Sequence, residues 1–291
     1  MDKEQLQGLL REIESGGSST NYGVMLERHQ VVGELPWWEE KTSIGRGKNQ
    51  RFQTLRSFVD EGGAPIGIWE DESVEEHISE IIKALITCKV WNVKSDEIAP
   101  GQECVIYTFV IGEGEYILVT SGDSMNRMVL AEVDMLFKRV SYNLLNSGKG
   151  AAVVCHMDAP KNENQAYSIQ LQNIGNEAVF IRKPLLGQGT EHQHLRIEYA
   201  LTVDEVTGQT GEDLKFIPVD SEYQTEEDPE KHETSVEIPP GESFTITARP
   251  QLPKNGKYYV RAVYTNYLQN ILLDRHFIRG RVFSRSKLIE R

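Results

Sequence analysis

The chain has 291 residues, of which 39% are hydrophobic, 8% are aromatic and 26% are charged, and its formal net charge at pH 7 is -13. This balance excludes wholesale disorder, collagen and coiled coil as the overall class. Because a single hydrophobic core stops growing at about 250 to 300 residues, the length favours two domains of similar size. The excess of acidic residues repels phosphate polymers, so we expect no nucleic-acid partner.

The sequence carries no targeting or metal-binding signal. No apolar stretch approaches the roughly 18 residues that cross a bilayer, and the charged N-terminus lacks the apolar centre of a secretory signal. Cys88, Cys104 and Cys155 lie far apart without Cys-x-x-Cys spacing, which favours buried free thiols. His192 and His194 lack a third ligand at defined spacing. We therefore expect a cytoplasmic protein without a membrane span, metal or cofactor.

Residues 1–148 are predicted to form a mixed α+β domain, which opens with a helix from Asp2 to about Glu14. Pro36, Gly45 and Gly47 break the regularity that follows, so the stretch Gly33–Asn49 is expected to be a long loop. A helix is then predicted from about Gln50 to Val59.

The rest of this domain is predicted as helix, hairpin, helix. A capping-box pattern at Ser73–Glu76 opens a helix that runs to about Thr87. The β-rich runs Cys104–Ile111 and Tyr116–Thr120 flank a glycine-rich turn and predict a hairpin. A helix follows between Asp123 and Ser147. The side chains expected to be buried together on this helix are Met128, Leu136 and Val140.

Residues 149–291 are predicted to form an antiparallel β domain, because helical periodicity disappears after Gly150. Ile169–Glu177, Pro239–Phe244 and Tyr258–Tyr264 resemble segments of bacterial immunoglobulin-like or fibronectin-like sandwiches. The resemblance implies an immunoglobulin-like β-sandwich and carries no catalytic residue. The predicted strands are 151–157, 167–172, 178–183, 195–203, 214–219, 234–238, 243–249, 257–264 and 276–285.

One short motif points to an enzyme. Glu14-Ser15-Gly16-Gly17 ends the first predicted helix and precedes Leu26-Glu27-Arg28-His29. These segments resemble the N-acetylmuramidase family of phage and bacterial endolysins. The resemblance implies peptidoglycan hydrolysis with Glu14 as the general acid. The glycines after Glu14 and the charged residues before it indicate an open helix end, so we expect Glu14 to be exposed.

Two other segments are candidates for binding a protein partner. Trp37 and Trp38 form an adjacent aromatic pair after a proline, and aromatic side chains stack on a partner's apolar surface. Arg279, Arg281 and Arg285 share one face of the last predicted strand by parity. This basic stripe suits an acidic partner or the acidic loop 222–233 of the chain itself.

Two functional hypotheses follow. The first is a non-enzymatic interaction or regulatory protein that acts as a subunit or adaptor of a larger cytosolic assembly. The alternative is a lysozyme-type peptidoglycan hydrolase with Glu14 as general acid. The sequence leaves the partner and the oligomeric state open.

Overall fold

The computed structural model divides into two compact units, Met1–Phe58 with Ile68–Gly150, and Val59–Gly67 with Ala151–Arg291. Most of the described chain is antiparallel sheet with several helices, which confirms the predicted α+β class. The described residues are 1–16, 21–32, 35–47, 51–57, 59–60, 65–99, 102–122, 124–147, 149–160, 166–182, 195–201, 216–225, 235–253, 255–266, 278 and 280–290.

The first unit is built on a sheet with the strand order β5-β3-β2-β1-β6-β7. Neighbouring strands from β3 to β7 run antiparallel. Alternate residues of β1, such as Val24 and Leu26, are buried on one face, as the two-residue period of a strand requires. The strands are β1 (Tyr22–Val32), β2 (Leu35–Arg46), β3 (Arg51–Ser57), β5 (Ile66–Asp71), β6 (Cys104–Ile111) and β7 (Gly114–Ser121).

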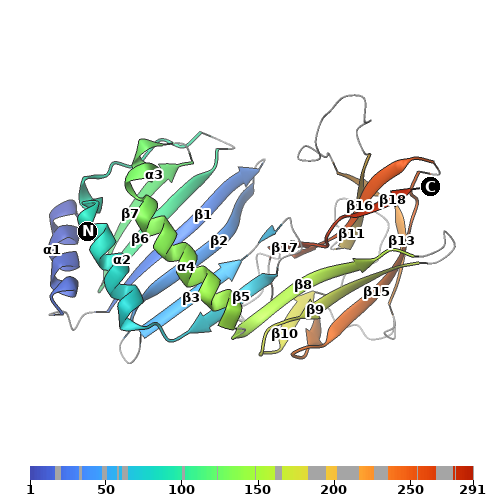
Figure 1. Ribbon diagram of the computed structural model, residues 1–291, viewed down its shortest axis with the longest axis horizontal. Coiled ribbons are helices and arrows are strands. Elements are labelled where there is room, and N and C mark those ends of the chain that lie inside the picture. The colour runs from blue at the N-terminus through green and yellow to red at the C-terminus, as the bar shows by residue number, and fades with distance from the viewer. Residues whose placement is uncertain are drawn as a thin grey trace. The chain divides into compact units, whose positions relative to one another are not determined.

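Helices cover one face of this sheet. Figure 1 shows α2 (Glu75–Thr87) and α4 (Ala131–Ser147) lying across the strands, with α1 (Lys3–Glu14) beside α2. A capping box between Asp2 and Gln5 begins α1. Its fully buried Leu6 anchors the helix, which packs against α2 and the 3-10 turn η1 (Val90–Asn92). The short helix α3 (Met125–Val129) precedes α4.

Four sequence predictions for this unit are wrong. The expected loop 33–49 contains strand β2, and the expected helix 50–59 contains strand β3. Val74 is the N-cap of α2 and makes no side-chain cap hydrogen bond, so the capping box at Ser73 does not form. Met128 is 69% exposed, whereas Leu136 and Val140 are buried as expected. Met128 belongs to the separate short helix α3, none of whose residues is buried.

In the second unit, all described regular elements are strands. One group has the order β13-β15-β9-β8 and another the order β12-β11-β16-β17-β4. Strand β18 also pairs with β16, and β10 pairs with β14. The bounds are β4 (Val59–Asp60), β8 (Gly150–Asp158), β9 (Tyr167–Asn173), β10 (Val179–Arg182), β11 (Leu195–Leu201), β12 (Ile217–Val219), β13 (Ser221–Thr225), β14 (Ser235–Ile238), β15 (Ser243–Pro250), β16 (Lys257–Asn266), β17 (Gly280–Phe283) and β18 (Lys287–Glu290).

Alternation along the strands builds one core for this unit. Ile169 and Leu171 of β9 belong to the same buried cluster as Ile197 of β11 and Val260 and Ala262 of β16. Side chains from both groups of strands therefore share a single hydrophobic interior. No helix in the described part of the chain is long and apolar enough to span a membrane.

Candidate functional site

The face of the first unit's sheet that points away from α2 and α4 carries exposed apolar side chains. Strand registers place Met25 opposite Thr108 and Thr108 opposite Ile117, so these three residues share that face. Ile117 is 51% exposed and Val110 is 40% exposed. No described helix of this unit lies over them (Figure 1). We call this surface the open face; its other apolar members are Phe52, Ile106 and Val119.

A pocket of about 320 Å³ lies at the end of the open face. Gly23 of β1 and Phe52 of β3 line it, and Gly45 of β2 lies opposite both of them. Because neither glycine carries a side chain, the ring of Phe52 lies across both, with its Cζ at 3.5 Å and 2.9 Å from where their Cβ atoms would stand. Met25 and Val110 complete the apolar lining. The glycines thus make room that any side chain would fill.

Few polar groups join this lining. Ser43 is half-buried and Arg46 is exposed at the rim. Beyond Met25 on the same strand face, the buried carboxylate of Glu27 is paired with the Lys41 ammonium at 2.5 Å. A buried acid with its own counter-ion is satisfied in place. The surface therefore suits apolar contact with a partner better than proton transfer.

The outer edge of the sheet is closed to strand addition along β7. The backbone carbonyl of Glu115 accepts from the N-terminal amine of Met1, and that of Val119 accepts from the backbone N–H of Asp96. The backbone N–H of Ser121 donates to the Asp96 carboxylate at 2.9 Å. These contacts occupy groups with which another strand would pair. Strand addition along this part of β7 is therefore hindered, whereas the open face is uncovered by the described helices of this unit.

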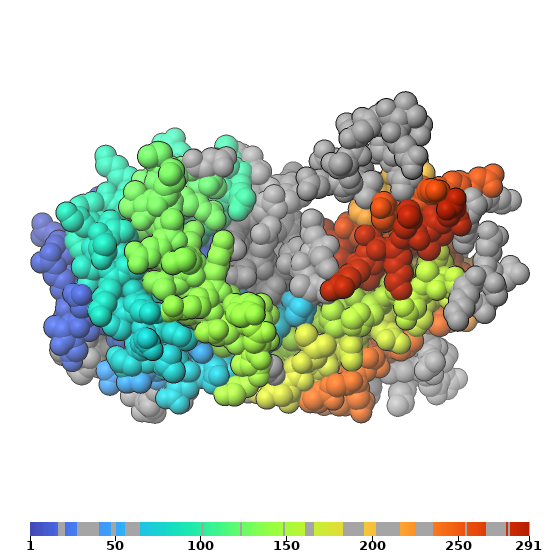
Figure 2. Space-filling view, in the orientation of Figure 1, coloured from blue at the N-terminus to red at the C-terminus, as the bar shows by residue number. Residues whose placement is uncertain are grey.

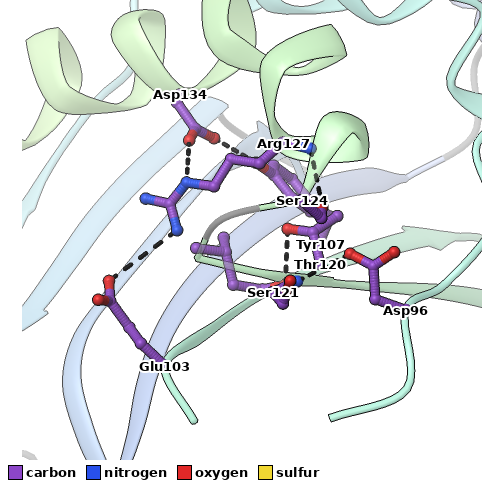
Figure 3. A network of polar contacts seen from close by, with 9 residues as sticks. Asp96, Glu103, Tyr107, Thr120, Ser121, Ser124, Arg127 and Asp134 are labelled. Atoms are coloured by element: carbon purple, nitrogen blue, oxygen red, sulfur yellow. Dashed lines mark hydrogen bonds and ion pairs between the residues drawn. The ribbon is translucent and has the colours of Figure 1, made fainter.

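A polar network lies beneath α3 and α4, on the opposite face of the sheet (Figure 3). Tyr107 of β6 donates a short hydrogen bond to Asp134 of α4. Arg127 of α3 approaches Asp134 at 3.4 Å and Glu103 at 3.9 Å. Tyr107 is fully buried and Asp134 is 8% exposed, so a substrate could not reach the pair. The network fastens both helices to the sheet.

Asp96 forms the neighbouring part of this region. Burial raises the pKa of its carboxyl, but hydrogen bonds from Ser124, from the Ser121 backbone and from Asn126 outweigh it, so the pKa lies below its usual range. The Asn126 amide donates to Asp96 at 2.6 Å. Asp96 thereby holds its own segment against both β7 and α3.

The cysteines and acids show no arrangement for chemistry. Burial raises the pKa of the Cys155 thiol to about 12 and that of Cys88 to about 11, and it also raises that of Cys104. All three are therefore protonated at neutral pH, when a nucleophile needs the thiolate. Among the described residues, no three His, Cys, Asp or Glu side chains come together as metal ligands.

The structure places Glu14, the candidate acid, at the end of α1 with its side chain exposed, as expected. A general acid with a raised pKa needs a cleft, and an exposed helix end does not provide one. Glu27 of the same motif is paired with Lys41. The side chains of Arg28 and His29 lie outside the described residues.

The predicted partner-binding residues belong to different units of the chain. Trp37 and Trp38 belong to β2, and their side chains lie outside the described residues. Arg281 of β17 is half-buried near the ring of Phe283, whereas Arg285 is exposed beyond the end of β17. Arg279 is outside the described residues, as are His192 and His194 and most of the acidic loop.

Sequence analysis missed the residues that form the pocket. Gly23, Ser43, Phe52 and Val110 come from four strands, and their common position depends on the registers. The available signal was a glycine inside an alternating strand, which often marks a close approach. No protein-family model matches the chain, and no curated protein sequence matches it. The function is therefore inferred from the geometry of the chain itself.

Proposed function

We propose that the protein is a non-enzymatic interaction protein that acts as a subunit or adaptor of a larger cytosolic assembly. The observation that carries this proposal is the open face with its apolar pocket. Val110 and Ile117 are 40% and 51% exposed beside a pocket lined by Met25 and Phe52. A contiguous exposed apolar surface is typical of a protein contact site.

The occupant of this face is an apolar segment of a protein partner. An aliphatic or aromatic side chain of that segment fills the pocket between Met25, Phe52 and Val110, and its neighbours cover Ile117 and Val119. The exposed guanidinium of Arg46 at the rim is suited to a nearby acidic residue of the partner. Because β7 is closed along its edge, side-chain packing supplies the contact.

The remaining parts of the proposal concern the second unit and the other predicted contacts. Its antiparallel strands and single core support an immunoglobulin-like sandwich, a fold that serves as a binding or spacing module. Trp37 and Trp38, on the same strand as Ser43 and Gly45, extend the contact with the partner. Arg281 and Arg285, together with Arg279, offer a second, basic contact.

Affinity purification from the native cells tests the proposal with a matched pair of variants. Ile117→Glu places a charge on the open face, and Val74→Glu places the same charge at a similarly exposed residue at the start of α2. We expect the first variant to lose specific co-purifying proteins that the wild type and the second variant retain. Equal recovery with all three proteins would contradict the proposal.

A further inference from the structure

The helices α3 and α4 carry a second apolar surface, on their outer side. Six large side chains between residues 125 and 145 are at least 40% exposed, among them the methionines Met125 at 73%, Met128 at 69% and Met135 at 61%. In the space-filling view these helices, drawn in green, lie uncovered on the viewed face (Figure 2). We call these six residues the helix patch; its other members are Val129 at 49%, Tyr142 at 67% and Leu145 at 40%.

The area of the helix patch suits a protein interface. If a large side chain carries roughly 200 Å² of accessible surface, these exposed fractions leave on the order of 700 Å². A stable interface of standard size buries about 800 Å² on each partner. The patch alone therefore supplies most of one side of such an interface. Its methionines are flexible and polarizable, which favours close packing against another surface.

The charges around the helix patch indicate which partner fits it. The chain carries a net charge of -13, so two copies repel each other over most of their surfaces. The charges on the outer side of α4 are balanced, because exposed Glu132 and Lys138 have opposite signs and Arg139 is paired with Glu80 of α2. A second copy could therefore approach here with little repulsion.

The order of residues is also self-complementary. In antiparallel packing about a twofold axis, a residue before the axis on one helix faces the residue equally far after it on the other. With the axis at Met135, Glu132 faces Lys138 of the second copy. Met135 meets its own copy at the axis. An apolar residue thus meets an apolar residue, and opposite charges meet on either side of it.

We propose that the protein forms a twofold-symmetric dimer in solution through the helix patch, with α4 antiparallel to α4 of the second copy and Met135 at the axis. This inference is independent of the open face, which lies on the other side of the sheet. Dimerisation leaves the open face of each copy free for its partner and doubles the number of partner sites in the assembly.

Sedimentation velocity over a range of protein concentrations tests the dimer. We expect a monomer–dimer equilibrium in the wild type. Met135→Arg brings two like charges together at the axis and should weaken dimerisation at least 100-fold. Ile117→Arg, which makes the same kind of change on the open face, should leave it unchanged. A wild type that stays monomeric at all concentrations, larger open-ended oligomers, or a dimer that Met135→Arg leaves intact would each overturn the proposal.

A charge exchange tests the antiparallel register without relying on a disrupted variant. Glu132→Lys and Lys138→Glu each create two like-charge contacts in a homodimer, and each should weaken it by about tenfold. In an equimolar mixture, every contact between positions 132 and 138 again joins opposite charges, so a heterodimer should form with the wild-type affinity. A folding defect cannot be rescued by mixing. A mixture that associates no better than either variant alone would overturn the proposed register.

Discussion

Replacement of Gly45 by alanine tests the packing that makes the pocket. A Cβ atom at this position would stand 2.2 Å from the Tyr22 carbonyl oxygen, 2.8 Å from the Gly23 Cα and 2.9 Å from the Phe52 Cζ. The first two are backbone atoms of the paired strand and cannot move aside without separating β1 from β2. We therefore expect Gly45→Ala to be strongly destabilising.

The magnitude follows from two opposing effects. Alanine in a strand gains about 0.5–1 kcal/mol over glycine because it loses less conformational entropy. Overpacking costs about 1–3 kcal/mol, and contacts with backbone place this site at the upper end. Gly23→Ala is the matched control, since its new Cβ would meet only the Phe52 Cζ, at an ordinary 3.5 Å. The entropy gain applies to both variants, so they should differ in free energy of unfolding by the overpacking cost, about 2–3 kcal/mol.

Urea unfolding followed by far-ultraviolet circular dichroism measures this difference. Hydrogen exchange of the β1 and β2 amides assigns it to the first unit rather than to the whole chain. We expect Gly45→Ala to lower the midpoint and to speed exchange in both strands, and Gly23→Ala to leave both unchanged or improved. If Gly45→Ala were as stable as Gly23→Ala, the description of the close packing around Gly45 would be wrong.

Three further predictions concern the core, the polar network and Glu14. Leu136→Ala should cost about 2–5 kcal/mol in urea unfolding, whereas the exposed Asn143→Ala should cost less than about 0.5 kcal/mol; equal losses would contradict the burial of Leu136. The lowered pKa of Asp96 means that its contribution to stability is complete above the unfolded value of about 3.9 and is lost as pH falls through the folded value. Asp96→Asn should therefore flatten the loss of stability below about pH 4, and an unchanged profile of unfolding midpoint against pH would refute this. In a turbidity assay the wild-type protein and Glu14→Gln should both leave peptidoglycan intact, and clearance by the wild type alone would restore the hydrolase hypothesis.

The local spacing of apolar residues was sufficient to predict part of the fold. The helical spacing of Leu6 and Leu10 predicts α1, and that of Ile78, Ile82 and Leu85 predicts most of α2, because a one-sided apolar stripe fits only a helix against a core. Strict alternation likewise predicts β9 and β16. In each case the burial of the segment follows its own periodicity.

The missed elements lack a signal of their own. Pro36 and Gly45 in β2 indicate a loop when the strand is taken alone, yet Thr42 and Ile44 are buried through pairing with β1 and β3. The short run from Arg51 to Ser57 fits both the two-residue period of a strand and the 3.6-residue period of a helix. It forms strand β3 because it pairs with β2. The assignment of Val59–Gly67 to the second unit also depends on distant partners.

The candidate site was less accessible from the sequence than the fold. The pocket is lined by Gly23, Phe52 and Val110 from three different strands, and no local pattern specifies the registers that bring them together. The helix patch could not be predicted from the sequence for a related reason. One continuous helix with Met128 in the core was expected, but Met128 belongs to the separate helix α3, none of whose residues is buried.

Site-specific photo-crosslinking in the native cells tests the central claim most directly. A benzophenone-bearing residue at position 117 probes the open face, and the same residue at position 201, where Leu201 is 60% exposed in the second unit, serves as the control. We expect position 117 to yield discrete adducts with a partner protein, which position 201 does not yield and which Val110→Glu abolishes. Absence of adducts at position 117, or adducts that persist with Val110→Glu, would contradict the assignment of the open face as the partner-binding surface.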